Sequence, residues 1–327
     1  MADNAITAAL RLESGRVGRA LYASGTGLVS AEEVEMKQGI AGLVVAAGLA
    51  ACFVAKPAAA SYCTDTNVAT LTSDPYTTHW GAHQGLSCLE EHFIAAGDRR
   101  AIFASVYTLT TLRMAESIDS GAYVNSAWMK SYQTEFANHY RTALRAYELG
   151  NRSQVPNAWL KAFDAAASGQ TLIIQDVLLG MNAHIDFDLP FAIEAVKISP
   201  NTNSRYADHQ RVNTVLAEIG DEIIAALGSL YGTNYAALDS ALGPLDELLL
   251  ATGMSTARQN AWNNAVLLTA SAPWNRWLVV GGIDVAAVSS ANLTLGLTLS
   301  PTLRNALRAL EGSNPGSTFC QHFACGI

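Results

Sequence analysis

The segment Gly180-Met-Asn-Ala-His-Ile-Asp-Phe-Asp-Leu-Pro190 places one imidazole and two carboxyl groups inside a largely apolar run from Leu172 to Ile193. In a helix, side chains four residues apart lie on one face, so His184 and Asp188 are presented to the same point. Polar groups within an apolar helix cost free energy unless they are paired. This helix must therefore satisfy its own polar groups or use them chemically.

Two interpretations of the His184 and Asp188 pair follow. A histidine and a carboxylate at this spacing can chelate a divalent metal, or the carboxylate can orient a histidine that acts as a base. Alternatively, the two side chains only satisfy each other. Asn182 and Asp186 lie on the neighbouring face and are candidate supporting residues. Because proline cannot donate an amide hydrogen, the helix is expected to kink or break before Pro190.

The remaining hydrophobic pattern is helical throughout. Apolar side chains recur with a period near 3.6 residues after Asp98, along an aromatic stripe from Trp128 to Tyr147, and again from about Tyr206 to Leu230. No alternating strands and no repeat of solenoid length are present in the sequence. The sequence therefore predicts an all-α, bundle-like single domain, with an irregular arm at 61–96, a helical core at 97–312 and a cysteine-containing tail at 313–327.

The apolar stretch from Leu278 to Leu299 is long enough to raise the question of a membrane segment. Polar residues interrupt it, among them Asp284, Ser289 and Asn292. Such residues are costly in a bilayer, so the stretch is interpreted as a buried helix and loop.

Charge and composition limit the classes of partner. The 327-residue chain has a formal net charge of −8, and only 15% of its residues are charged. Phosphate contacts require concentrated positive charge, and the sequence has no cluster of lysine and arginine. Nucleic acid is therefore not expected as a partner.

The N-terminal region has the features of an export signal. Residues 36–60 combine a short positive start, an apolar centre and a small-residue exit, which is typical of a signal peptide cleaved before Ser61. The alternative is a lipoprotein acylated at Cys52. Residues 1–35 are interpreted as a non-native or disordered extension; if Met1 is the true start, the apolar stretch becomes a signal-anchor. The expected localisation is secreted, with lipoprotein anchoring as the alternative.

Four cysteines remain after the leader, namely Cys63, Cys88, Cys320 and Cys325. An even number in an exported chain indicates two disulfides, whose pairing the sequence leaves open. The arm and the tail are each tied down, either locally or to one another.

A second concentration of polar groups begins the helix after the motif and includes Asp208, His209 and Asn213. Short connections favour neighbouring placement of consecutive helices, so Asp208 is a candidate supporting carboxylate and third metal ligand beside His184 and Asp188. Ordinary capping of the helix N-terminus is the competing interpretation of Asp208.

The quoted segment resembles the hallmark of an uncharacterised helical family with the pattern G-[IM]-N-A-H-I-N-x-D-L-P. Further resemblance lies in Gly97 to Phe103, Trp159 to Phe163 and Arg258 to Trp262. Asp186 stands where this family usually has asparagine. The resemblance implies an all-helical fold and no established activity. A weaker likeness is to zinc-dependent phospholipase C and P1-type nucleases, which bind metals through His and Asp on bundled helices.

The leading hypothesis is an exported metal-assisted hydrolase of an ester or phosphoester. His184 and Asp188 would be the catalytic residues, a divalent metal such as zinc would be bound by them and Asp208, and Asn182, Asp186 and Asn213 would support the site. The alternative is a non-catalytic secreted binding protein with an apolar cavity for a small-molecule or lipid-like ligand. Membrane contact is expected only if Cys52 is acylated or the leader is retained.

Overall fold

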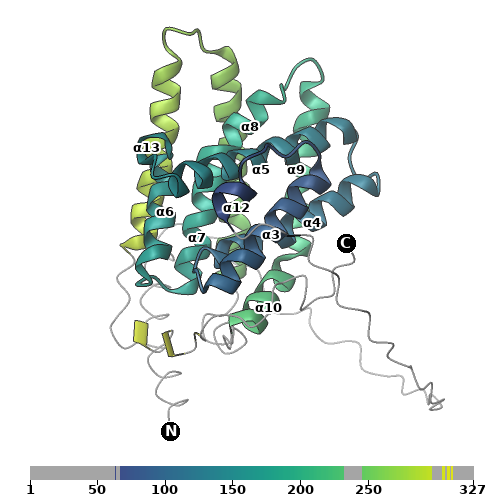
Figure 1. Ribbon diagram of the computed structural model, residues 1–327. Helices are drawn as coiled ribbons and strands as arrows, with labels where there is room; N and C mark the ends of the chain where they lie inside the picture. The colour runs from purple at the N-terminus through teal and green to yellow at the C-terminus, as the bar shows by residue number, and fades with distance from the viewer. Residues whose placement is uncertain are drawn as a thin grey trace, which may run out of the picture. The chain divides into compact units, whose positions relative to one another are not determined.

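The computed structural model describes residue 63, residues 67–231 and 245–296, and residues 304, 305, 308, 309 and 311. Within these ranges the regular structure is helical and contains no strand, which confirms the predicted all-α class (Figure 1). The extension 1–35, the leader 36–60 with Cys52, and the tail 313–327 with Cys320 and Cys325 lie outside the described residues. The helices are α2 (Val68–Leu71), α3 (His79–Ala96), α4 (Ala101–Asp119), α5 (Ser126–Glu148), the 3-10 turn η1 (Arg152–Gln154), α6 (Asn157–Ser168), α7 (Ile173–Asn182), the π-helix η2 (Ala183–Asp188), α8 (Leu189–Ala195), α9 (Thr202–Glu218), α10 (Gly220–Tyr231), α12 (Leu245–Ala270) and α13 (Arg276–Leu295).

The predicted aromatic stripe of α5 packs into the interior. Trp128, Tyr132 and Tyr140 are buried, because their spacing places them on the face of α5 that meets α3, α4 and α8. Tyr140 belongs to one hydrophobic cluster and Trp128 to a second. The aromatic residues of this helix are therefore core residues that join two parts of the interior.

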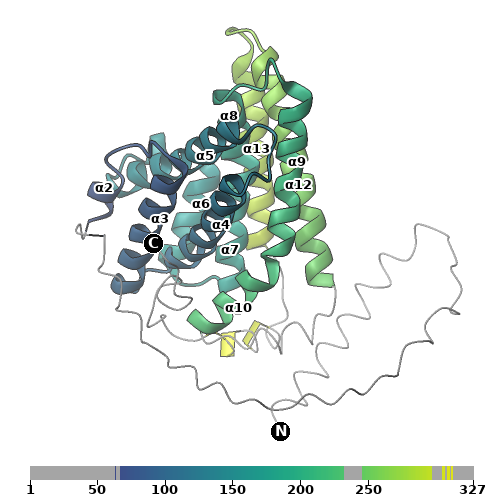
Figure 2. The same cartoon turned by 90° about the vertical axis from the view of Figure 1, so that its right-hand side faces the viewer.

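Helix α3 corrects the expectation of an irregular arm as far as residue 96. The Thr78 hydroxyl accepts the Gly81 N–H at 2.9 Å and starts the helix, and Gly97 ends it with a φ of 65°. Between these caps, an apolar face packs against α4 (Figures 1 and 2). The sequence pattern was obscured by buried polar side chains, His83 and Glu90, on that same face.

Helices α7, η2 and α8 form one continuous helical rod through the interior, so the expected break at Pro190 does not occur. The rod widens instead into a π turn, in which the Leu189 N–H donates to the carbonyl of His184, five residues earlier. A proline ring normally clashes with the carbonyl four residues before it. The wider π turn accommodates Pro190 at the start of α8 while the backbone stays helical.

Helix α13 differs from the expected buried segment. Its inner face buries Ile283, Ala287 and Ala291, but only 17% of its most apolar window lies inside the structure. Within the described residues α13 is the one helix that is long and apolar enough to cross a membrane, by length and composition. With α12 it forms a hairpin whose turn extends beyond the neighbouring helices (Figures 1 and 2). The apolar composition of α13 therefore did not predict how much of the helix is buried.

Candidate functional site

The predicted pairing of His184 and Asp188 is formed. The Nδ1 atom of His184 lies 3.0 Å from Oδ2 of Asp188, and both side chains are almost completely buried. The same carboxyl oxygen accepts the indole N–H of Trp159 at 2.8 Å. Asp188 therefore bridges the imidazole to α6, a contact that the sequence motif alone did not indicate.

Aromatic rings enclose His184. Its imidazole stacks on Phe136 with centroids 3.5 Å apart, and the edge of Tyr107 approaches with a centroid distance of 4.4 Å. Phe103 and Trp159 lie farther out, each at 6.0 Å. The Nε2 atom is buried and has no hydrogen-bond partner among the described residues.

This enclosure determines the charge of the pair. Burial, together with the nearby His139, lowers the pKa of His184 well below its ordinary value. Burial raises the pKa of Asp188 well above its ordinary value, and the Trp159 hydrogen bond opposes that rise. Burial therefore favours the neutral form of His184, and in the tautomer that donates Nδ1–H to Asp188 its Nε2 carries a lone pair.

Gly180 has a packing role in the same segment. A Cβ atom at this position would lie 2.3 Å from Cδ2 of Phe103. Phe103 in turn contacts His184 and Trp159. The missing side chain of Gly180 thus lets α4 approach α7 and closes the aromatic enclosure.

Asn182 and Asp186 point to different surroundings. The Asn182 amide donates to the carbonyl of Ala287 at 2.9 Å and so fastens α7 to α13, while its Oδ1 has no partner in the described part of the chain. Partial burial raises the pKa of the Asp186 carboxyl to about 6. Within the described residues, no hydrogen bond joins either side chain to the imidazole of His184, so their predicted supporting role does not include such a bond.

Asp208 is placed elsewhere, contrary to the expectation that it supports His184. Its carboxylate accepts the backbone N–H groups of Val124 and Asn125 at 2.9 and 2.7 Å, and the Asn125 side-chain amide at 2.8 Å. It therefore orders the loop between α4 and α5. A buried carboxylate with three donors has its acceptor capacity committed to structure.

Asn213 and His209 belong to a network between α9 and α12. Asn213 Oδ1 accepts the Arg258 Nε–H at 2.8 Å, and Arg258 also donates to the carbonyl of His209. The His209 ring lies 3.0 Å from both the Tyr132 hydroxyl and the Arg258 carbonyl. These contacts join α9 to α12. Asn213 is therefore bound in this network and not beside Asp188, where its supporting role was predicted.

The described residues contain no group of three or more His, Cys, Asp or Glu side chains arranged to hold a metal ion. The set of His184, Asp188 and Asp208 is not brought together, since each carboxylate is bound by other donors. The chemistry of these residues therefore does not fit a zinc centre.

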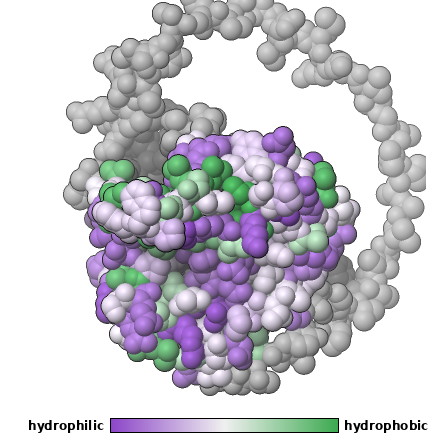
Figure 3. Space-filling view, turned by 90° about the horizontal axis from the view of Figure 1, so that it is seen from above, coloured by the Kyte–Doolittle hydropathy of each residue, from purple (hydrophilic) through white to green (hydrophobic). Residues whose placement is uncertain are grey.

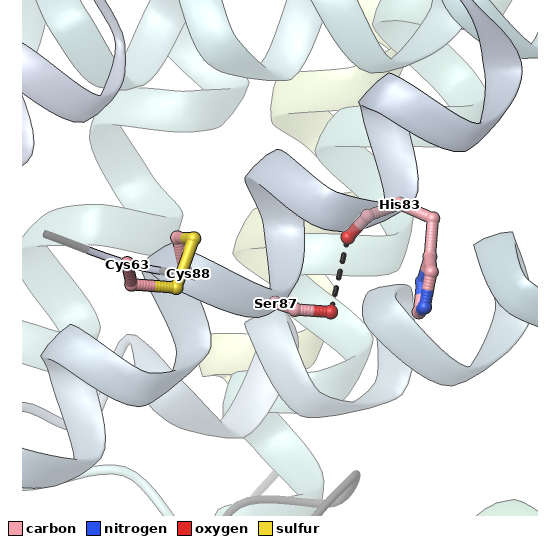
Figure 4. The surroundings of a disulfide bond; sticks show 4 residues. All are labelled: Cys63, His83, Ser87 and Cys88. Atoms are coloured by element: carbon pink, nitrogen blue, oxygen red, sulfur yellow. Dashed lines mark hydrogen bonds between the residues drawn. A yellow bond between two sulfur atoms is a disulfide. The ribbon is translucent and has the colours of Figure 1, made fainter. Parts of the chain in front are cut away.

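One disulfide of the predicted two lies within the described residues. Cys63 is bonded to Cys88 of α3, so the arm is tied locally (Figure 4). In the same turn of α3, the Ser87 hydroxyl donates to the carbonyl of His83 at 3.1 Å, and the imidazole points away from the disulfide (Figure 4). The disulfide therefore fastens the chain to α3 and stands apart from this imidazole.

An open groove between α6 and α13 was not predicted from the sequence. Its volume is about 590 Å³, and a second hollow of about 390 Å³ continues it along the two helices. Phe187 of the π turn contributes to the wall. The groove is lined by Arg152, Ser153, Val155, Pro156, Asn157, Leu160, Phe187, Trp277, Val280, Gly281 and Asp284. Helical spacing alone could not reveal this site, because its walls come from segments more than a hundred residues apart.

Comparison with known proteins identifies one family. Residues 82–295, well over half of the chain, match the Family of unknown function (DUF5995). No functionally curated protein and no solved structure matches the chain significantly.

Proposed function

We propose that this chain, which belongs to the Family of unknown function (DUF5995), is a non-catalytic binding protein for an amphipathic small molecule held between α6 and α13. The observation that carries the proposal is the open groove of about 590 Å³. Small-molecule sites typically occupy about 300–1,000 Å³ and combine mostly apolar walls with a few polar groups. The lining of this groove has that composition.

The apolar part of the groove suits the body of such a ligand. Leu160, Phe187 and Val280 contribute from three different helices, and Trp277 adds a large aromatic side chain at the α13 end. No atom beyond its own neighbouring backbone lies within 4 Å of where a Cβ of Gly281 would stand, so the floor of the groove is open at this point.

The polar part of the groove suits a head group with both donors and acceptors. Asn157 donates to Asp284 at 2.8 Å, which orients both side chains at the groove wall. Arg152 forms an exposed ion pair with Asp164 at 2.6 Å and keeps a cation at the rim. An uncharged head group can hydrogen-bond to Asn157 and Asp284, and a carboxylate head group can share the Arg152 cation with Asp164.

The same geometry disfavours the hydrolase hypothesis. The paired atoms of His184 and Asp188 face each other and Trp159 inside the aromatic enclosure, and a substrate bond must lie within hydrogen-bond reach of a catalytic base. By contrast, Phe187 of the same segment lines the groove. We therefore assign the enclosed pair a role in shaping the helix that carries Phe187.

Export remains part of this proposal. The leader at 36–60 and the Cys63–Cys88 disulfide both support an oxidising compartment, because structural disulfides persist there. The intact mass of the secreted protein tests this point. A mature chain starting near Ser61 agrees with the proposal, whereas a chain that retains residues 1–35 contradicts it.

The binding proposal is tested by filling the groove. Gly281→Leu adds a side chain into open space, and Gly282→Leu is a matched control, since Gly282 is its neighbour in α13 but does not line the groove. The probe is a dansyl-labelled fatty acid, followed by fluorescence titration. We expect Gly281→Leu to weaken binding about tenfold or more, which corresponds to about 1.4 kcal/mol, and Gly282→Leu to bind like the wild type.

Two results would overturn the binding proposal. One is equal probe affinity in the wild type and both glycine variants, or no binding at all. The other is stoichiometric zinc in the purified protein that is lost in His184→Ala, which would restore the hydrolase hypothesis.

A further inference from the structure

The hairpin of α12 and α13 carries exposed hydrophobic side chains around its turn. We define the apolar tip as Val266 and Leu267 of α12, Trp274 of the turn, and Trp277 and Leu278 of α13. Their exposed fractions run from 39% for Val266 to 77% for Trp274. Figure 3 looks down on this end of the molecule, and hydrophobic side chains gather there. Exposed apolar groups that are clustered in this way mark an interaction surface.

From the apolar tip we infer that this hairpin docks the protein onto a lipid bilayer surface, with Trp274 and Leu278 entering the interface. The first argument is charge. Between Arg258 and Asp284 the chain has a single charged residue, Arg276, and an ion pair with Glu194 neutralises it. The tip can therefore leave water without desolvating an unpaired charge.

The second argument is the chemistry of the two tryptophans. Within the described residues, no hydrogen bond uses the indole N–H of Trp274 or Trp277, and both side chains are largely exposed. A dry protein interface would bury these donors, whereas a bilayer interface offers water and head-group acceptors beside an apolar region. Two exposed indoles on an uncharged tip therefore favour lipid over a second protein surface.

The third argument is the position of α13 itself. Leu278 and Val285 are seven residues apart and share the outward face, opposite the buried Ile283 and Ala287. The outward face of α13 thus continues the apolar tip along the helix. Trp277 also lines the groove, so docking would bring the mouth of the groove to the lipid surface. This last link rests on the proposed function, whereas docking itself does not.

The experiment uses the full chain and phosphatidylcholine vesicles. Trp274→Ser with Leu278→Ser removes two tip side chains that do not line the groove. The matched control is Val124→Ser with Leu149→Ser, which removes two exposed hydrophobic side chains at other sites. We expect the tip variant to partition onto vesicles at least about tenfold more weakly than the wild type, which corresponds to about 1.4 kcal/mol, and the control variant to partition normally.

A second readout separates the tip from any contribution of residues 36–60. Vesicles with brominated acyl chains quench tryptophans that enter the bilayer, and Trp274→Phe keeps the tip apolar while removing that emission. We expect less quenching in Trp274→Phe than in the wild type. Equal quenching in the two proteins, or equal partition of the tip variant, would overturn the inference. So would a concentration-dependent dimer that only the tip variant loses.

Failure of docking and failure of ligand binding can be told apart. The tip variant leaves the groove lining intact, and Gly281→Leu leaves Trp274 and Leu278 in place. In the tip variant, loss of vesicle binding with normal binding of the dansyl fatty acid supports docking. Normal vesicle binding by the tip variant contradicts docking, and weaker binding of the dansyl fatty acid by Gly281→Leu then supports the groove alone.

Discussion

The imidazole of His184 and the ring of Phe136 lie nearly parallel, 7° apart in orientation and 3.5 Å apart between centroids. His184 therefore packs as an aromatic core residue on one side and hydrogen-bonds to Asp188 on the other. The ring of His184 thus contributes both aromatic packing and a hydrogen bond to the π-helix η2.

Asp188 is expected to matter as a hydrogen-bond acceptor. Asp188→Asn keeps an acceptor for the Trp159 indole and the His184 ring, so the free energy of unfolding should stay close to the wild-type value. Asp188→Leu leaves two buried N–H groups without a partner, at about 1–3 kcal/mol each. Urea unfolding of both variants measures the difference. An equal loss in both variants would show that the charge, and not the acceptor, is needed.

Gly180 is expected to tolerate no side chain. Gly180→Ala forces a methyl group into the ring of Phe103, and overpacking of this kind costs about 1–3 kcal/mol. Gly253→Ala is the control, because a Cβ there meets no atom within 4 Å and alanine favours the helix by about 1 kcal/mol. Thermal unfolding compares them. Partial rescue of Gly180→Ala by Phe103→Leu would identify the clash as the cause.

His209 is expected to make folding weaker in acid. Burial first, and then the neighbouring Arg258 cation, lower the pKa of this imidazole well below its ordinary value. Below about pH 6.5 the unfolded state then binds a proton that the folded state does not, so stability falls by up to about 1.4 kcal/mol per pH unit. His209→Gln should flatten the dependence by this amount. Denaturant unfolding at a series of pH values from about 7 to about 5 measures this slope.

The same pH series, carried out on Asp188→Asn, tests the protonation of His184. Its lowered pKa acts in the same direction as that of His209, but the raised pKa of Asp188 acts in the opposite direction, because the folded carboxyl binds a proton that the unfolded one has released. In the wild type the two effects on the free energy of unfolding therefore have opposite signs. In Asp188→Asn the His184 effect is unopposed and the slope should become steeper. An unchanged slope would contradict the neutral imidazole.

Asp208 is expected to stabilise the loop between α4 and α5 and to leave ligand binding unchanged. Asp208→Ala removes the charged acceptor of the part-buried Val124 and Asn125 N–H groups, and hydrogen bonds to a charged group contribute about 1.5–3 kcal/mol. The exposed Asp221 provides the control variant, Asp221→Ala. Calorimetry reports the stability, and titration with the dansyl fatty acid reports binding. Loss of probe binding at equal stability would return Asp208 to the site.

Local periodicity predicted much of the fold. The stripe of α5 and the one-turn spacing of His184 and Asp188 follow from helix geometry, and both are present in the structure. The exposure of α13 could not be predicted from the same periodicity. Gly281, Gly282 and Ala286 count as apolar in the sequence, but they are exposed in the structure. Small residues carry little information about which way a helix faces.

Long-range placement limited the prediction of the site. Asp208 is close to Asp188 in sequence, but α9 carries it to Asn125, more than eighty residues away along the chain. The groove likewise depends on α6 meeting α13. Neither the contact of Asp208 with Asn125 nor the groove between α6 and α13 can be predicted from the local sequence pattern, because capping residues and groove walls have the same composition as ordinary surface.

The π turn has a consequence for cooperativity. Leu179 and Ala183, before or at the turn, belong to one hydrophobic cluster, whereas Leu189 and Ile193, after it, belong to another. A π turn contains more residues than an α turn, so it changes the angular phase of the helix between these two pairs. One uninterrupted rod is thus shared by both clusters. The two halves of the interior are mechanically linked, and they should exchange their amide hydrogens as a single unit.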